Sequence, residues 1–225
     1  MMSGDLPIGD QQAALLAEGM DALALPATDA QRAKLLGYLQ LLQKWNTAYN
    51  LSAVRDPLRM VTQHLLDCLA VVSVLNRQFD GTALRILDVG SGGGLPGVVL
   101  AVMQPSWSVC CVDAVAKKAF FVRQVAGELQ LKNLQAEHAR VETLRTAPFD
   151  LIVSRAFSSL QDFVALTRSQ LAPGGAWLAM KGRVPDEEIA ALPPGVSVFH
   201  VERLEVPGLD AQRCLVWMRP TPKLG

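Results

Sequence analysis

The chain has 225 residues, of which 50% are hydrophobic, and this is enough to bury one sizeable core and an appendage. Its 21 basic and 21 acidic residues cancel, so bulk electrostatics gives no reason to expect a nucleic-acid partner. No apolar run approaches the roughly 20 residues that a membrane span needs, and the N-terminus lacks the pattern of a cleaved signal. We therefore expect a cytoplasmic protein with no membrane partner.

The four cysteines show no spacing that is typical of metal ligands. Cys110 and Cys111 are neighbours inside a predicted strand, as expected for reduced thiols in the core of a cytosolic protein. We therefore expect no metal site.

The front of the chain is predicted to be helical. Apolar residues recur at helical spacing over 10–25, and a proline follows. Thr28 and Gln31 form a capping-box pattern for a second helix that runs to residue 48. Asp56 and Pro57 are a cap and first-turn pair for a third helix, which runs to residue 76. Residues 1–80 are therefore expected to form a helical extension, and residues 81–225 the main domain, which the motifs described below identify as the cofactor-binding one.

Strands and helices alternate in the centre of the chain. The strands are predicted at 84–89, 107–112, 134–138, 149–154 and 175–181, and the helices at 95–104, 114–130 and 160–171. This alternation is typical of an α/β fold with a mostly parallel sheet and helices on both faces. Two further β-rich runs, 196–206 and 213–218, are predicted to form a terminal hairpin.

The segment RILDVGSGGGLPG, residues 85–97, has the composition of a ligand-binding turn. Its glycines allow a tight turn and a close approach of a ligand to the backbone. A helix is predicted to follow from Leu95, with Pro96 in its first turn and free amides that attract polar or anionic groups. Asp88 places a charge beside the opening, and Asp113 ends the next strand, where an acid commonly binds ribose hydroxyls.

Two classes of cofactor are compatible with this turn. Gly92, Gly94 and Gly97 match the G-x-G-x-x-G spacing of nicotinamide and flavin proteins, with Asp113 as the ribose acid. Asp88 and the glycines also give Asp-x-Gly-x-Gly-x-Gly, the pattern of S-adenosylmethionine-dependent methyltransferases. A carboxylate there suits a ligand with an ammonium and a sulfonium, and disfavours a pyrophosphate. Together with the terminal hairpin, this favours a methyltransferase, and an NAD-dependent oxidoreductase remains the alternative.

A longer set of motifs resembles one bacterial family. The motifs are Lys44-Trp45-Asn46, Tyr49-Asn50-Leu51, His64-Leu65-Leu66-Asp67, the turn GSGGGLPG, Ser154-Arg155-Ala156-Phe157 and Lys181-Gly182. In this order they resemble the RsmG (GidB) family over residues 30–220, although Gly93 stands where many members have proline. The resemblance implies a Rossmann-like class I methyltransferase fold with a mostly parallel seven-stranded sheet and a terminal antiparallel hairpin. It also implies methylation of nitrogen-7 of a guanine in the 530 loop of 16S ribosomal RNA, with the RNA or the small ribosomal subunit as partner.

The resemblance places cofactor contacts on five residues, and position along the chain adds three. Those implied by the family are Gly90, Leu95, Val141, Glu142 and Arg155, and those inferred from the turn and the strand ends are Asp88, Gly92 and Asp113. Without the resemblance, Val141 would be interpreted as a core valine, while for Glu142 a solvated carboxylate and a functional residue would be equally good interpretations.

Methylation at nitrogen-7 asks little acid–base chemistry of the protein, because this nitrogen has a free lone pair and no proton to lose. Catalysis then depends on orientation and electrostatics, and no single catalytic residue is assigned. Arg155, Lys181 and Arg123 are candidates to orient the guanine, since cations commonly bind guanine O6.

Two polar residues of the front half are substrate candidates with structural alternatives. His64 shares a helical stripe with apolar residues and is expected to be a hydrogen-bonded core histidine rather than half of a dyad with Asp67. Asn50 either caps a turn or contacts the substrate. Trp45 and Tyr49 could stack on an extruded base, but their helical spacing favours the core. We expect a monomer, and a non-catalytic cofactor-binding RNA module is the second alternative function.

Overall fold

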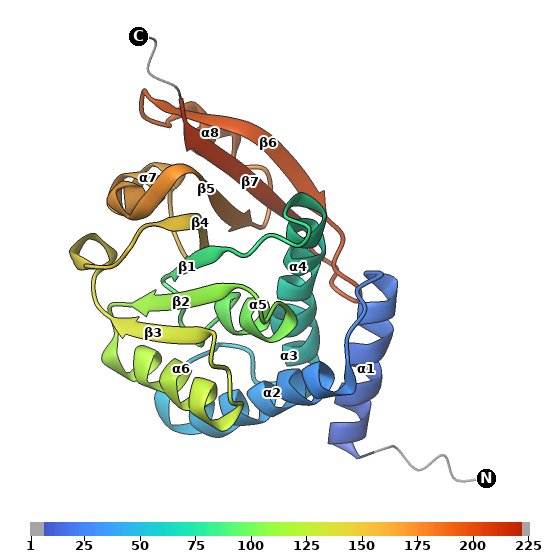
Figure 1. Cartoon of the computed structure of the whole chain (residues 1–225). Helices are drawn as coiled ribbons and strands as arrows, with labels where there is room; N and C mark the ends of the chain where they lie inside the picture. Colours follow the sequence, from blue (N-terminus) through green and yellow to red (C-terminus); the bar gives the residue numbers. More distant parts are fainter. Residues whose placement is uncertain (1–6, 222–225) are drawn as a thin grey trace.

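The computed structural model describes residues 7–221 and contains one seven-stranded sheet in the order β3-β2-β1-β4-β5-β7-β6 (Figure 1). The strands are β1 (Arg85–Val89), β2 (Ser108–Asp113), β3 (Leu134–His138), β4 (Phe149–Ser154), β5 (Leu171–Lys181), β6 (Val196–Leu204) and β7 (Arg213–Pro220). Strands β1 to β5 pair in parallel, whereas β7 lies antiparallel between β5 and β6. The predicted mostly parallel sheet with a terminal antiparallel hairpin is confirmed.

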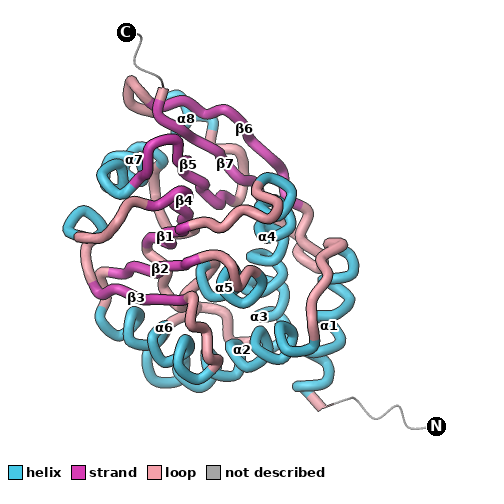
Figure 2. Tube along the Cα trace, viewed as in Figure 1, coloured by secondary structure: helices cyan, strands magenta, loops and turns pink. Residues whose placement is uncertain are grey.

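Helices cover both faces of this sheet (Figure 2). They are α1 (Ile8–Ala22), α2 (Asp29–Tyr49), α3 (Pro57–Met60), the π-helix η1 (Val61–Leu66), α4 (Asp67–Gln78), α5 (Gly97–Met103), α6 (Ala116–Glu128), the 3-10 helix η2 (Val141–Thr143), α7 (Leu160–Thr167), the 3-10 helix η3 (Arg168–Gln170) and α8 (Asp186–Ala190). The capping box predicted for the second helix is present, because the Gln31 amide donates to the Thr28 hydroxyl and the Gln31 side chain accepts from the Thr28 amide.

Two hydrophobic clusters form, one on each face of the sheet. Side chains alternate along each strand, so Ile86 joins the cluster beneath α1 to α6, and its neighbour Leu87 joins the cluster beneath α7. The first cluster also contains Leu35 and Leu39 of α2. The N-terminal helices therefore bury their apolar faces in the same core as β1, and the expected boundary at residue 80 stays a prediction.

Several predicted helices differ in detail from those in the structure. The helix after the glycine turn begins at Gly97, not at Leu95, and Pro96 is its N-cap after a cis peptide bond. The reason is local: the chain is still turning through Gly94, and the Gly97 amide is held by Asp88 instead of being free. The short helix α8 was not predicted, and the third predicted helix contains the π-helical turn η1.

One helical stretch, Pro57–Gln78, is long and apolar enough to cross a membrane by length and composition alone, with a window of mean hydropathy 1.4. Polar residues such as His64 and Asp67 interrupt it, so it contains no uninterrupted apolar run of roughly 20 residues. In the structure 78% of that window is buried inside the fold, as in the central helix of a packed core.

Candidate functional site

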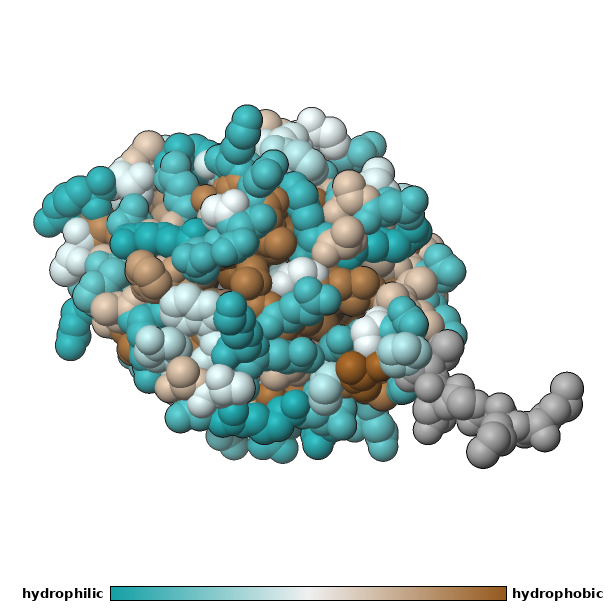
Figure 3. Space-filling view, turned by 90° about the horizontal axis from the view of Figure 1, so that it is seen from below, coloured by the Kyte–Doolittle hydropathy of each residue, from teal (hydrophilic) through white to brown (hydrophobic). Residues whose placement is uncertain are grey.

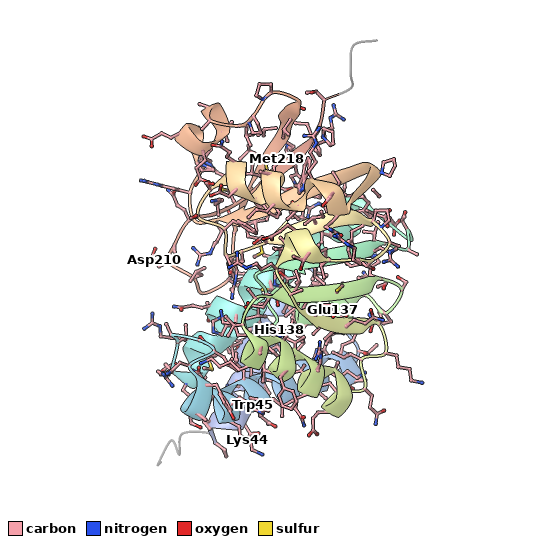
Figure 4. All side chains as sticks on the ribbon, turned by 90° about the vertical axis from the view of Figure 1, so that its left-hand side faces the viewer. Lys44, Trp45, Glu137, His138, Asp210 and Met218 are labelled. Atoms are coloured by element: carbon pink, nitrogen blue, oxygen red, sulfur yellow. The ribbon has the colours of Figure 1, made fainter. Side chains whose placement is uncertain are left out.

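The carboxyl ends of the parallel strands bring the predicted site residues to one edge of the sheet. Gly90, Asp113, Arg155 and Lys181 each end or directly follow one of the strands β1, β2, β4 and β5. Figure 4 views the molecule from the left of Figure 1, where the arrowheads of β2 and β3 point. Ligands of open α/β sheets bind outside this edge.

The glycine turn adopts backbone angles that need glycine. Gly90, Gly92 and Gly94 have φ values of +68°, +59° and +89°. The turn is held from α2 as well, because the buried Tyr38 hydroxyl donates to the Gly93 carbonyl over 2.7 Å. The N-terminal helices therefore support the turn directly.

Asp88 lies beneath the turn and is fully buried. Its Oδ2 accepts a 2.8 Å hydrogen bond from the Gly97 amide, while Oδ1 has no partner in the described part of the chain. Burial raises the pKa of this carboxyl from 3.8 to about 7, although the Gly97 hydrogen bond and Arg155 act in the opposite direction. An unpaired buried carboxylate oxygen is costly, and a cationic ligand group nearby would offset that cost.

Asp113 closes the other side of the turn. Its Oδ2 accepts from the Gly92 amide at 3.0 Å, and its Oδ1 accepts from the Val115 amide at 2.9 Å. Lys118 lies 3.6 Å from the same carboxylate. The Asp113 side chain therefore links the glycine turn to the start of α6.

A pocket of about 520 Å³ opens at this edge between the sheet and the N-terminal helices. Its lining combines glycine-turn residues with charged groups from several elements: Leu42, Leu51, Ser52, Ala53, Val54, Gln63, His64, Asp67, Gly93, Leu95, Arg155, Met180, Lys181, Gly182 and Arg213. Leu95, Arg155, Lys181 and His64 were predicted site residues, and the structure brings them together here.

A buried carboxylate organises two arginines in this pocket. Asp67 at the start of α4 lies 3.2 Å from Arg155 Nη1 through Oδ2 and 2.8 Å from Arg213 Nε through Oδ1. Arg155 also donates to the Gln63 carbonyl. Both guanidinium groups remain partly exposed toward the pocket, so Asp67 holds them in place while part of each stays accessible.

Lys181 is held in a similar way from the other side. Its Nζ lies 2.8 Å from Glu188 Oε2 in α8 and also donates to the Phe157 carbonyl. Glu188 in addition accepts from the Leu160 amide at the start of α7. The helix that was not predicted therefore positions a predicted site residue.

His64 is a neutral core histidine. Its Nε2 lies 2.7 Å from Ser52 Oγ, and Nδ1 has no partner among residues 7–221. Burial, followed by the charge of Arg155, lowers its pKa from 6.5 to about 4. The Asp67 carboxylate points to Arg155 and Arg213 and not to His64. His64 and Asp67 therefore do not form a dyad in this arrangement.

The loop after α2 forms one wall of the pocket. The buried Asn46 exchanges hydrogen bonds with the backbone of Ser52, and Arg55 donates to the Asn46 carbonyl. Asn50 is the left-handed C-cap of α2, with φ of 50°, and its Oδ1 accepts from Arg55 Nη2 at 2.6 Å. Asn50 therefore has the capping role that was one of its two predicted roles, and it does not line the pocket.

Other predicted residues also lie outside the lining of this pocket: Asp88, Gly90, Gly92 and Asp113 at the glycine turn, and Val141, Glu142 and Arg123 farther away. Val141 is buried and Glu142 is exposed, with Oε1 4.0 Å from Arg140 Nη1, in the short helix η2 after β3. Arg123 donates to the Ala136 carbonyl and lies 3.8 Å from Glu137 at the β3 edge of the sheet.

Sequence reasoning missed Arg213 and the positioning role of Asp67. The first residue of an antiparallel last strand lies at the same edge as the last residues of the parallel strands, and Lys181 pairs with Cys214, the neighbour of Arg213. That placement could have identified Arg213. The motif His64-Leu65-Leu66-Asp67 drew attention to Asp67, but nothing in the sequence shows that this side chain holds two arginines. Within residues 7–221 no group of three or more His, Cys, Asp or Glu side chains could hold a metal ion.

Comparison with known proteins gives consistent matches. The family model described as rRNA small subunit methyltransferase G matches residues 31–216. Ribosomal RNA small subunit methyltransferase G of Leptothrix cholodnii is 60% identical over 205 residues, which cover 91% of this chain and 94% of that protein. The protein of the same name from Bordetella pertussis is 53% identical over 221 residues and covers 96% of this chain and 95% of its own length.

Solved structures support the fold. The O-methyltransferase from Bacillus cereus in complex with SAH superimposes with a TM-score of 0.56 at 19% identity, covering 95% of this chain and 100% of that chain. TrmN from Thermus thermophilus gives a TM-score of 0.53 at 18% identity, covering 96% of this chain and 80% of that chain. At such low identity these likenesses show the class I methyltransferase architecture and nothing further.

Proposed function

The chain belongs to the rRNA small subunit methyltransferase G family, and from this premise we propose that it methylates nitrogen-7 of a guanine in the 530 loop of 16S ribosomal RNA. Methyl transfer from S-adenosylmethionine to small-subunit rRNA follows from the family itself. The base, the atom and the loop are the finer part. The observation that supports them best is the pocket in which Arg155, Lys181 and Arg213 converge beside the glycine turn.

The residues at the carboxyl edge fit the chemical parts of the cofactor. The unpaired Oδ1 of Asp88 supplies negative charge beneath the turn, where an ammonium would lie, and Gly90 brings backbone close to it with no Cβ. Asp113 lies where ribose hydroxyls would be bound, and the Gly92 amide donates a hydrogen bond to the same carboxylate. Val141 and Glu142 would flank the adenine, while Leu95 forms the apolar wall on the pocket side.

The cofactor, when bound, supplies an electrophilic methyl group on a positively charged sulfur. The protein's own task is to orient a guanine whose nitrogen-7 faces that methyl group. Arg155 and Arg213 can each donate hydrogen bonds toward O6 or a phosphate from the face that Asp67 leaves free. Because nitrogen-7 carries no proton, His64 need not act as a base, and its lowered pKa keeps it neutral.

The family match decides between the alternatives. A nicotinamide-dependent oxidoreductase is set aside because relatives at 53–60% identity carry the name of a methyltransferase over nearly the whole chain. A non-catalytic binding module is set aside on the same ground, since these relatives are named as enzymes. We also propose that the protein acts in the cytoplasm as a monomer without a membrane partner.

Methyl transfer in solution tests this function. Purified protein is incubated with labelled S-adenosylmethionine and with small ribosomal subunits from cells that lack the endogenous enzyme. We expect label in 16S RNA, and binding of S-adenosylmethionine but not NADH by calorimetry. Arg155→Ala should bind the cofactor more weakly and transfer the methyl group more slowly. Cofactor binding without methyl transfer to any small-subunit RNA would contradict the proposed enzymatic activity. A failure to bind S-adenosylmethionine would contradict the proposed cofactor site.

A further inference from the structure

An exposed aromatic surface lies beside the pocket, where α2 packs on α6. Trp45 is half-buried at its centre, with ring centroids 5.2 Å from Tyr49 and 5.7 Å from Phe120. The outer two rings are open to solvent, because Tyr49 is 42% exposed and Phe120 is 57% exposed. Trp45 thus has the packing role that its helical spacing predicts, whereas Tyr49 and Phe120 are available for contact. We call Tyr49 and Phe120 the aromatic surface.

The charge around this surface is one-sided. Residues 41–55 and 114–127 contain five Lys or Arg and no Asp or Glu, although the whole chain has a net charge of zero. Lys117 is one helical turn from Phe120, so the two side chains are neighbours. Lys44 precedes Trp45, and neither Lys44 nor Lys117 has an ion pair within residues 7–221. Figure 4 shows Lys44 and Trp45 together, below Glu137 and His138.

Carboxylates border this region and pair with two of its five cations. Asp113 lies 3.6 Å from Lys118, and Glu137 lies 3.8 Å from the exposed Arg123. Lys44, Lys117 and Arg55 stay exposed. The lower side of the molecule in Figure 1, seen in Figure 3, shows brown apolar side chains between teal hydrophilic ones. Exposed rings flanked by unpaired cations are complementary to unpaired bases and phosphates.

The aromatic surface is continuous with the rim of the pocket. Tyr49 is the last residue of α2, and Leu51 to Val54 in the following loop line the pocket. Arg55 fastens this loop to the end of α2 through Asn46 and Asn50. At the other side, α6 begins just after Asp113, which holds the glycine turn. RNA that reaches the pocket across this rim would therefore pass over the two rings.

We infer that the aromatic surface, together with Lys44 and Lys117, binds an unpaired stretch of ribosomal RNA next to the target guanine, an inference that rests on the function proposed above. Phe120 and Tyr49 stack on bases that flank the guanine, and the two lysines contact phosphates. Stacking on an aromatic side chain is tolerant of base identity. This surface therefore increases affinity for the RNA and leaves the choice of guanine to the pocket.

Steady-state kinetics with small subunits tests this inference. Phe120→Ala and Tyr49→Ala should each raise KM for small subunits about tenfold while kcat stays near that of the wild type. Phe120→Trp should retain a KM near the wild-type value, because the stacking face is kept. Affinity for S-adenosylmethionine, measured by calorimetry, should be unchanged in all of them. Lys44→Gln combined with Lys117→Gln should reduce the salt dependence of RNA binding by about two units of slope.

Phe199 provides the matched control. It is a phenylalanine with 43% exposure in β6, outside the aromatic surface, so Phe199→Ala should leave KM unchanged. If the wild type methylates subunits and Phe120→Ala and Tyr49→Ala keep KM within about twofold, the inference is wrong while the proposed function stands. If the variants weaken binding to assembled subunits but not to free 16S RNA, the surface contacts a ribosomal protein, and the inference is also wrong. If the wild type transfers no methyl group to RNA, the proposed function itself fails.

Discussion

Two buried titratable residues near the glycine turn carry opposite pH dependences. His64 has a pKa lowered to about 4, so between pH 4 and 6.5 the unfolded chain binds a proton that the folded protein excludes. Its contribution makes the protein more stable as pH rises through that window. Asp88 has a pKa raised to about 7, so between pH 3.8 and 7 the folded protein keeps a proton that the unfolded chain loses. Its contribution makes the protein less stable as pH rises.

Single substitutions should separate these two contributions. In His64→Gln, the free energy of unfolding should fall with rising pH more steeply than in the wild type. In Asp88→Asn, it should rise more steeply, and each difference in slope should be at most about 1.4 kcal/mol per pH unit. Urea unfolding at half-unit steps from pH 4 to 7 measures both slopes. If the free energy of unfolding varied with pH in the same way for the wild type and both variants, the buried environments assigned to His64 and Asp88 would be contradicted.

The carboxylate of Asp67 holds the two arginines of the pocket in place. It bridges Arg155 and Arg213, and it is almost fully buried. Asp67→Asn removes the charge from between two guanidinium groups and should lower the free energy of unfolding by about 2 kcal/mol. Thermal unfolding measures this loss. Asp29→Asn is the control, since Asp29 pairs with Arg32 on the surface and should change stability by less than about 0.5 kcal/mol.

The start of α5 lies so close to the sheet that its first residue, Gly97, has no room for a side chain. A Cβ at Gly97 would overlap the Cys111 sulfur and lie 2.9 Å from Asp88 Oδ2. Gly97→Ala should therefore destabilise the protein by about 1–3 kcal/mol. Gly127 in α6 is the matched glycine, because a Cβ there meets nothing within 4 Å. Gly127→Ala should stabilise the protein by about 0.5–1 kcal/mol, and equal effects of the two substitutions in thermal unfolding would contradict this packing.

The elements that sequence patterns predicted well are those with strong local signals. The capping box at Thr28 and Gln31 and the alternation of the central strands are present in the structure. The π-helical turn η1 and the short helix α8 were not predictable, since tertiary contacts define them. Glu188, for example, is held by Lys181 at the end of β5 and by the Leu160 amide at the start of α7, both of which lie outside the helix itself.

Sequence reasoning reached part of the candidate site through chain position and part through the family resemblance. Asp113 was inferred from the end of its strand, and Gly90 and Arg155 from the resemblance; all three lie at the carboxyl edge of the parallel strands. Arg213 became visible only with the order of the sheet, because its strand runs the opposite way. The partner of Arg213, Asp67, comes from a helix 146 residues away in the sequence, and no local pattern connects them.

The whole molecule should unfold as one unit. The N-terminal helices share the larger hydrophobic cluster with β1, β2 and α5, and Tyr38 holds the glycine turn. Urea unfolding followed by circular dichroism and by tryptophan fluorescence should therefore give coincident transitions. Residues 81–225 alone should show no cooperative transition. Two separated midpoints in the full chain would indicate that the extension and the remainder fold independently.

The position of the transferred methyl group tests the central claim most directly. A bacterial strain without its own enzyme for this modification is supplied with the chain or with Arg155→Ala, and its 16S RNA is digested and mapped by mass spectrometry. We expect one 7-methylguanine in the 530 loop with the wild-type chain, and a much lower level with Arg155→Ala. A methyl group on another base or another atom, or an unmodified 530 loop with the wild-type chain, would contradict the proposed function.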